Sequence, residues 1–375
     1  MATDFAAEGL LDGLDGEARS ARADLLRALE EEGVPAEDIR AAAQDGRLMF
    51  LLAERAVGGT PQYTAREVAE RTGLALDRLT TLRRAQGLPA PEPDARVFSD
   101  TDLEAARNAI AFEEAGVPFD QQLAVVRVLG RGLGQAAEAM RATVLELVLE
   151  PGATEAELAR RVGREVERLM PLVNPALDQL LRIHLRQLVR TEAISAAERL
   201  EGSLPGAREV TVAFADLVGF TRLGEEVPPD ELSRVADRLA ELTGDVLRGD
   251  VRLVKTIGDA AMLTAPEPGE LLGVCLDLVA AADGEGEDFP QLRAGVASGE
   301  ALSRAGDWYG RPVNLASRLT AIARPGSVLA TREVRDAVRD DFKWSTAGRR
   351  KIKGVDGQLN LYRARRPDPE DDATS

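Results

Sequence analysis

The chain has little of what disulfides, membrane spans or nucleic-acid surfaces require. It contains one cysteine, Cys275, which excludes an intrachain disulfide and lies in an apolar helical pattern typical of a core residue. No apolar stretch is long enough to span a bilayer, and the acidic N-terminus lacks the basic segment and apolar run of a secretory signal. The net charge of −17 argues against general affinity for nucleic acid or anionic membranes. We therefore expect a soluble cytoplasmic protein, whose 375 residues suffice for about two or three domains.

An apolar strand that ends in a carboxylate is the most informative segment. Residues 210–215 alternate like a strand with two distinct faces, so Asp216 stands at the carboxyl end of that strand. The N–H groups of residues 217–221, including those of Phe220 and Thr221, then open a helix, where phosphate is bound favourably. This combination predicts a site for a metal ion and a nucleotide. An aspartate in this position is also common as a turn former or helix cap, so the segment alone does not decide.

A second segment, residues 252–263, predicts a tight hairpin with Asp259 at or near its tip. An ordinary hairpin turn has the same pattern, but Lys255 lies inside an apolar strand, where a lysine must be exposed or paired. If the tip lies beside the end of the preceding strand, Asp216 and Asp259 meet, and their repulsion raises one pKa. A divalent cation relieves that repulsion, and hard oxygen ligands suit Mg²⁺ or Mn²⁺.

A third segment predicts a helix over residues 312–323. Asn314 and Arg318 are spaced i, i+4 and project from one face, where an amide and a guanidinium fit a ribose and a phosphate. The apolar stripe beside them, which anchors the helix in a core, is formed by Leu315, Leu319 and Ile322. The alternative is a surface helix with an incidental asparagine and arginine.

Together these segments resemble the catalytic region of class III nucleotidyl cyclases over residues 206–366. The residues that match, in order and local spacing, are Asp216, Lys255, Asp259, Asp307, Asn314 and Arg318. The resemblance implies that Asp216 and Asp259, assisted by the carbonyl of Leu217, bind two Mg²⁺ or Mn²⁺ ions per active site. It also implies that Lys255 and Asp307 read the purine. Asn314 would orient the ribose, and Arg318 would stabilise the charge that develops on the α-phosphate.

Hydrogen bonding favours ATP as the substrate of such a site. Adenine offers N1 as an acceptor and its 6-amino group as a donor, which a lysine and an aspartate complement. Guanine reverses both groups and leaves buried partners unmatched, at a cost of about 1–3 kcal/mol each. We therefore expect an adenylate cyclase in which the ribose 3′-OH attacks the α-phosphorus in line. The products are 3′,5′-cyclic AMP and pyrophosphate, and the two metal ions assist the reaction.

The order of the predicted elements resembles the ferredoxin-like α+β core of that family. After residue 206 come a strand, a helix (228–247), the hairpin, a helix (268–282), a strand (291–298) and the helix over 312–323. In the family the metal carboxylates and the other matched residues of one active site come from different chains. Because this chain carries both sets, the resemblance implies a homodimer with two complete sites.

Two segments depart from the pattern of many relatives. Residues 299–306 are shorter than the usual dimerisation arm and resemble the arm of some actinobacterial cyclases. Residues 351–357 resemble the region that carries a triphosphate-binding lysine, but Val355 stands at the usual position. Lys353 is the substitute candidate, and a solvated basic strand end is the alternative.

Residues 1–173 are predicted to form an all-α regulatory domain. A capping box at residues 64–67 opens a helix pair that is similar to the helix-turn-helix of MerR-type regulators. A transcription regulator that binds DNA here and senses nucleotides with its C-terminal domain is therefore the alternative function. DNA binding needs a basic recognition face, and the only obvious residues for it are Arg78, Arg83 and Arg84. Because the chain is acidic, we expect the helix pair to serve as a packing module instead. The arrangement resembles soluble actinobacterial cyclases whose N-terminal domain inhibits or regulates catalysis, in some cases in response to pH. The sequence identifies no small-molecule or lipid ligand of this domain.

A connector over residues 174–205 follows, in which Asn174 and Pro175 predict the start of a helix that runs to about Leu200. The only histidine of the chain, His184, lies in its apolar stripe, formed by Leu177, Leu180, Leu181, His184 and Leu188. A buried, hydrogen-bonded histidine is one interpretation, and a protonation switch is the other. The cyclase domain follows over residues 206–366, and residues 367–375 are predicted to be a disordered acidic tail.

Overall fold

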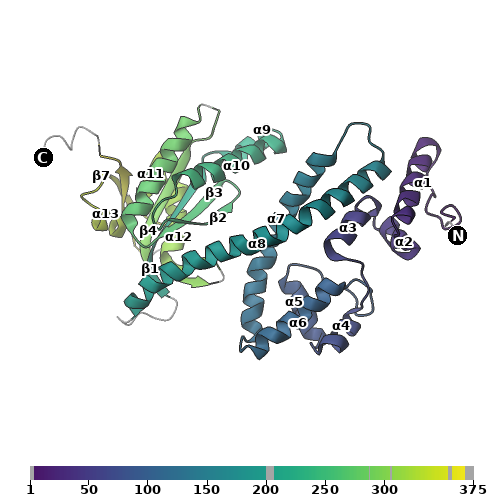
Figure 1. The fold of residues 1–375 in the computed structure, drawn as a ribbon. Coiled ribbons are helices and arrows are strands. Elements are labelled where there is room, and N and C mark those ends of the chain that lie inside the picture. The colour runs from purple at the N-terminus through teal and green to yellow at the C-terminus, as the bar shows by residue number, and fades with distance from the viewer. Residues whose placement is uncertain (1–3, 200–206, 287, 305, 354–356, 368–375) are drawn as a thin grey trace. The chain divides into compact units, whose positions relative to one another are not determined.

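A computed structural model of the chain describes residues 4–199, 207–286, 288–304, 306–353 and 357–367. The chain divides into two compact units, Met1–Ile194 and Ser195–Ser375 (Figure 1). The first is helical and the second contains a mixed sheet with helices on both faces. No described helix is long and apolar enough to cross a membrane.

The first unit is all-α over its described residues, as predicted. Its helices are α1 (Gly16–Glu31), α2 (Ala36–Gln44), the 3₁₀ turn η1 (Leu48–Phe50), α3 (Leu51–Gly58), α4 (Ala65–Thr72), α5 (Leu76–Ala85), α6 (Asp100–Glu114), α7 (Phe119–Val148) and α8 (Glu155–Arg199). Two apolar clusters hold them together. The first joins α1, α2 and α3 to the start of α8, and the second joins α4, α5 and α6 to the start of α7.

The capping box predicted at residues 64–67 is confirmed. The Thr64 hydroxyl accepts from the Glu67 backbone N–H at 3.1 Å, and the Glu67 carboxylate accepts from the Thr64 backbone N–H at 2.8 Å. These two bonds satisfy backbone donors that have no partner inside the first turn of α4. The helix ends at Gly73, whose φ of +81° lies in the left-handed region that favours glycine.

The predicted start of the connector helix is wrong. Helix α8 begins at Glu155, nineteen residues before Asn174, and continues to Arg199 with Pro171 and Pro175 inside it. An interior proline removes one backbone hydrogen bond and does not end a helix that has enough other support. Here the first turns of α8 are held by Ala156 and Ala159, which lie in the core with α1 and α2. Leu200 and the predicted linker to residue 206 lie outside the described residues.

The second unit is built on an eight-stranded sheet. Its strands are β1 (Ala207–Leu217), β2 (Arg252–Ile257), β3 (Ala260–Ala265), β4 (Leu292–Arg304), β5 (Asp307–Gly310), β6 (Ser327–Ala330), β7 (Lys343–Arg350) and β8 (Leu359–Arg365). Their order is β2-β3-β1-β4-β6-β8-β7, and β5 pairs with β4. The helices are α9 (Phe220–Glu226), α10 (Pro229–Val246), α11 (Pro268–Gly284), α12 (Arg311–Ile322) and α13 (Arg332–Ala337). The run β1-α10-β2-β3-α11-β4 has the β-α-β-β-α-β connectivity of the predicted ferredoxin-like core.

Two apolar layers cover the faces of this sheet, and β1 contributes to both. Val210 and Val212 are buried on the face that α12 covers, whereas Ala213 and Ala215 are buried on the face under α10 and α11. The predicted alternation of β1 is therefore confirmed. It places Asp216 on the α12 face, because successive side chains of a strand point to opposite faces.

Candidate active site

The two predicted metal-binding carboxylates lie together at one end of the sheet. Strand β1 runs between β3 and β4, and Asp216 is paired with Ala260 of β3, the residue that follows Asp259. The Leu217 N–H donates to the Asp259 carbonyl at 3.0 Å, so the β2–β3 turn is tied to the end of β1. That turn requires Gly258, whose φ is +58°. The sheet register thus brings together two aspartates that are 43 positions apart in the sequence.

The pKa of the Asp259 carboxyl is raised by burial and by this proximity. Burial raises the pKa of the Asp259 carboxyl, and the neighbouring charge of Asp216 raises it further; a backbone hydrogen bond and the Arg293 guanidinium oppose both effects. The increase is what two adjacent carboxylates should show when the negative charge between them is only partly compensated.

Arg293 supplies that partial compensation, and the sequence interpretation missed it. It lies on β4 directly opposite Asp216, whose Oδ2 accepts from Arg293 Nε at 3.1 Å and from Nη2 at 2.7 Å. The third nitrogen, Nη1, donates to the Ala321 carbonyl of α12 at 3.0 Å. The sequence does contain a signal for it. Arg293 is a charged residue at the start of an apolar strand and, like Lys255, must therefore be exposed or paired.

The donors at this end of the sheet fit a hard divalent cation. Among the described residues no group of three or more histidine, cysteine, aspartate or glutamate side chains could hold a metal ion. The chain offers two half-buried carboxylates and a backbone carbonyl at Leu217, all oxygen donors. Mg²⁺ is commonly bound by one or two carboxylates together with substrate phosphates and water, so this small set is sufficient for a metal that arrives with a nucleotide.

Lys255 and Asp307 form a second cluster. The Lys255 ammonium donates to Asp307 Oδ2, and the other carboxylate oxygen, Oδ1, accepts from the Trp308 backbone N–H at 2.9 Å. The two side chains are 37% and 28% exposed, so the pair is open to a ligand. Asp307 is positioned by the β4–β5 hairpin, in which it lies opposite Arg304, and Lys255 by the edge strand β2. The lysine in the apolar strand is therefore paired, as its position required.

Helix α12 carries Asn314 and Arg318. Its buried side includes Leu315 and Leu319, and the Thr320 hydroxyl ties it to β1 by donating to the Phe214 carbonyl at 3.0 Å. The prediction that Ile322 is a third anchor is wrong. Its side chain is 47% exposed, and it is the last residue of the helix. Asn314 is exposed and Arg318 is half-buried, and no described residue gives either side chain a hydrogen bond or ion pair.

The predicted phosphate-binding turn is smaller than expected. The Leu217 N–H bonds to Asp259 and the Val218 N–H donates to the Gln291 carbonyl at 2.8 Å, so neither is free for a phosphate. The prediction was wrong for these two groups because it ignored the strands on either side of β1. Gly219, with φ of +80°, is the N-cap of α9, and the N–H groups of Phe220 and Thr221 in its first turn stay predicted phosphate donors.

The remaining candidates lie outside these clusters. Lys353 is exposed next to Ile352, which is buried in the layer under α12, and Val355 lies outside the described residues. His184 is exposed, and so are Leu180, Leu181 and Leu188 of its stripe. The expected burial of this histidine is wrong for the described chain, because the helical unit packs nothing against this part of α8.

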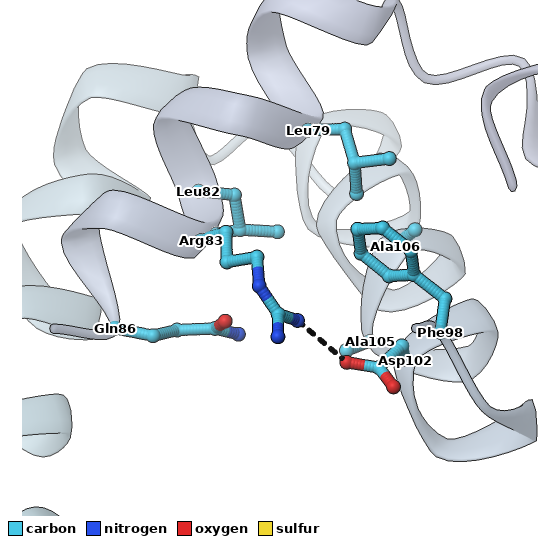
Figure 2. A pocket seen from close by; sticks show the side chains of 8 residues that line it. All are labelled: Leu79, Leu82, Arg83, Gln86, Phe98, Asp102, Ala105 and Ala106. Carbon is cyan, nitrogen blue, oxygen red and sulfur yellow. Dashed lines mark hydrogen bonds and ion pairs between the residues drawn. The ribbon is translucent and has the colours of Figure 1, made fainter. Parts of the chain in front are cut away.

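The helix pair α4–α5 does not present the basic face that DNA binding would need. Figure 2 shows Arg83 turned toward Asp102, which accepts its hydrogen bond at 3.2 Å, with the Phe98 ring 4.9 Å from the guanidinium. Arg78 pairs with Glu113 at 2.6 Å and stacks on Phe119. Two of the three available arginines are thus engaged within the helical unit. The cavity beside Arg83 measures about 10 Å³, enough for about one water molecule.

Comparisons with known proteins agree with both units. Residues 3–189 match the family model of the adenylate cyclase regulatory domain, and residues 204–364 match that of the adenylate and guanylate cyclase catalytic domain. The chain is 47% identical over 373 residues to the pH-sensitive adenylate cyclase MT1302 of Mycobacterium tuberculosis (strain CDC 1551 / Oshkosh), across 97% of this chain and 93% of that protein. It is 30% identical over 311 residues to an adenylate cyclase of Glutamicibacter nicotianae, across 78% of this chain and 76% of that protein. A crystal structure of the adenylyl cyclase CyaB from P. aeruginosa aligns with 44% of this chain and 96% of that chain, with 20% identity and a TM-score of 0.39.

The match over residues 204–364 shows that the sheet unit is a nucleotidyl cyclase catalytic domain, and both side-chain clusters lie within it. The chain belongs to the class III adenylate cyclases in which a regulatory domain precedes the catalytic domain. These matches support the cyclase over the transcription regulator. The likeness of the helical unit to MerR-type regulators is not confirmed.

Proposed function

We propose that this adenylate cyclase converts ATP into 3′,5′-cyclic AMP and pyrophosphate with the residues of the two clusters. The observation that supports this most is the Lys255–Asp307 ion pair, which holds a donor and an acceptor side by side on an accessible surface. Lysine has three N–H donors and a carboxylate about four lone pairs, so both groups keep hydrogen-bonding capacity while they are paired. The pair can thus donate to adenine N1 and accept from the 6-amino group at the same time.

Asp216, Asp259 and the carbonyl of Leu217 would hold two Mg²⁺ or Mn²⁺ ions at the end of β1. Bound there, the ions would lower the pKa of the ribose 3′-OH and clamp the phosphates. Arg293 binds only Oδ2 of Asp216, so Oδ1 lies outside this ion pair and would be a metal ligand. The two bonds from the guanidinium also hold the Asp216 carboxylate in one orientation before a nucleotide arrives.

Asn314 and Arg318 would act on a nucleotide held by the carboxylates of a second chain. Their side chains have no hydrogen-bonding partner among the described residues, although both project from a helix whose other side is anchored in the core. A fixed backbone with free side chains suits the orientation of a ribose and the stabilisation of charge on the α-phosphate. A homodimer would then contain two complete sites, each with one carboxylate pair and one α12 helix. Phe220, Thr221 and Lys353 would contribute donors to the phosphates.

Residues 1–173 would regulate this activity, by inhibiting it and with a dependence on pH. The support is the match to a regulatory domain family and a relative named as pH-sensitive. The test compares the pH–rate curves of full-length protein, of the His184→Gln variant and of the fragment 201–375. A fragment curve that differs from the full-length curve supports control by the helical unit. Three curves that superimpose would contradict both that control and a role of His184.

The catalytic assignment is tested with purified full-length protein, Mn²⁺ and either ATP or GTP. We expect cyclic AMP and pyrophosphate in equal amounts from ATP, and little product from GTP. The Asp216→Ala variant should abolish turnover, whereas Asp250→Ala, which changes an exposed aspartate before β2, should not. Near-normal activity of a well-folded Asp216→Ala protein would overturn the metal assignment.

A further inference from the structure

A groove on the catalytic unit lies apart from all the residues assigned above. It measures about 400 Å³ and runs between α11, the loop that follows α12, the start of β6 and the end of β8. Val328 and Ala364 at its base belong to the apolar layer under α10 and α11. Asp216 lies on the opposite face of the same sheet. The groove is therefore not a part of the proposed cyclase site.

The lining of the groove carries an excess of positive charge. It is lined by Arg324, Arg363, Arg365 and Arg366. Only Arg366 is neutralised: it donates to Asp277 at 2.7 Å and to the Gly273 carbonyl at 3.1 Å. The other three guanidinium groups have no hydrogen bond or ion pair with any residue that the structure describes. In a chain of net charge −17, three arginines around one hollow with no partner in the described part of the chain are an unusual concentration.

The remaining lining sets the size and polarity of a ligand. Among the described residues the only carboxylate of the lining is Asp283, which accepts a long hydrogen bond of 3.4 Å from Gln291 Nε2. Leu276, Val279 and Ala280 of α11 supply an apolar wall of the lining. A volume of about 400 Å³ is within the range of small-molecule sites. The groove thus combines an apolar wall with a set of guanidinium groups.

We propose that this groove binds a phosphate group that carries at least two negative charges. Guanidinium forks bind phosphate oxygens in a bidentate manner, and Arg324 and Arg365 are both exposed and free to do so. The apolar wall would pack against whatever the phosphate is attached to. The same chemistry is offered by a soluble phosphorylated molecule and by a phospholipid headgroup.

The first test is titration calorimetry of the full-length protein with inorganic pyrophosphate, in a chelator and without divalent metal. The Arg324→Gln/Arg365→Gln double variant should bind about tenfold or more weakly. The Asp283→Asn variant should bind more tightly, because it removes the one opposing charge. The matched control, Arg339→Gln, removes an exposed arginine outside the groove and should leave the affinity unchanged. Circular dichroism checks the fold of each variant.

Equal affinities in all four proteins would overturn the proposal, because any pyrophosphate binding would then belong to another site. Absence of binding to the wild type, together with absence of retention on vesicles, would also overturn it. A second arm distinguishes the two sources of phosphate by sedimentation with phosphatidylserine or phosphatidylcholine vesicles. Retention on the acidic vesicles alone, lost in the double variant, supports a lipid headgroup. Pyrophosphate binding without retention supports a soluble ligand.

Discussion

Gly295 determines how closely α12 packs on the sheet, and adding one methyl group should therefore reduce catalysis. A Cβ atom at this position would lie 2.4 Å from the Thr320 nitrogen and 2.6 Å from the Ala316 carbonyl oxygen. Both are backbone atoms of α12, so no side-chain rotation can relieve the contact. Since non-bonded atoms prefer separations of about 3.5 Å, the helix would have to move by about 1 Å.

That displacement should affect stability and activity together. Overpacking of a core typically costs about 1–3 kcal/mol of unfolding free energy. Helix α12 also carries Asn314 and Arg318, and a misplacement of about 1 Å can reduce catalysis about a hundredfold. We therefore expect the Gly295→Ala variant to fold with lower stability and to form cyclic AMP about two orders of magnitude more slowly. The measurements are urea unfolding and initial rates with saturating ATP and Mn²⁺.

The matched control is Gly244→Ala, an exchange of the same kind at an exposed position of α10 where an added Cβ meets no atom within 4 Å. It should retain the wild-type rate and gain up to about 1 kcal/mol from helix propensity. A Gly295→Ala protein with the rate and stability of the wild type would refute the close-packing argument.

Three further predictions concern single side chains. Burial raises the pKa of the Asp277 carboxyl, but Arg366 and Arg248 more than offset this effect, so the pKa is lowered overall. The charged carboxylate therefore stabilises the fold above the unfolded pKa of about 3.9. That stabilisation is lost as pH falls through the folded pKa. Asp277→Asn should lower the melting temperature at pH 7 by the equivalent of about 1 kcal/mol or less. The difference from wild type should shrink as pH falls below the unfolded pKa of about 3.9, and a difference that stays constant there would contradict the assignment. Burial raises the pKa of the Cys275 thiol to about 12, so at pH 8 about one molecule in ten thousand is a thiolate, and a thiol reagent should label the protein only after unfolding. Lys255→Gln should reduce kcat/KM for ATP by about 10- to 100-fold while leaving the rate with GTP almost unchanged, and an equal loss with both nucleotides would count against base recognition.

The sequence was most informative where a local pattern has one physical solution. The alternation of residues 210–215, the capping box at Thr64 and the positions of α10, α11 and α12 agree with the structure within one or two residues at most boundaries. The meeting of Asp216 with Asp259 also followed from local signals, because a hairpin tip and a strand end were both evident. A strand and a turn of this kind have few other ways to pack in one sheet.

What failed depended on contacts between distant segments. The Asp216–Arg293 pair joins residues 77 positions apart and arises from a strand register that no local pattern specifies. The same neighbouring strands occupy the Leu217 and Val218 N–H groups that had been predicted to bind phosphate. The apolar stripe around His184 indicates an amphipathic helix but not what covers it, and in the described chain it is exposed. Pro175 resembled a helix start, although α8 had begun at Glu155.

The most direct test mixes two inactive chains, Asp216→Ala and Arg318→Ala. Each variant alone lacks either the metal-binding set or the α12 set in both of its sites. In a mixed dimer one site combines the two altered halves, and the other combines the intact α12 of one chain with the intact carboxylates of its partner. With random exchange, about half of the dimers are mixed and each has one functional site, so the mixture should recover about a quarter of the wild-type rate of cyclic AMP formation. Recovery close to that value supports an adenylate cyclase site shared between two chains. No recovery, with subunit exchange shown by an independent label, would contradict it.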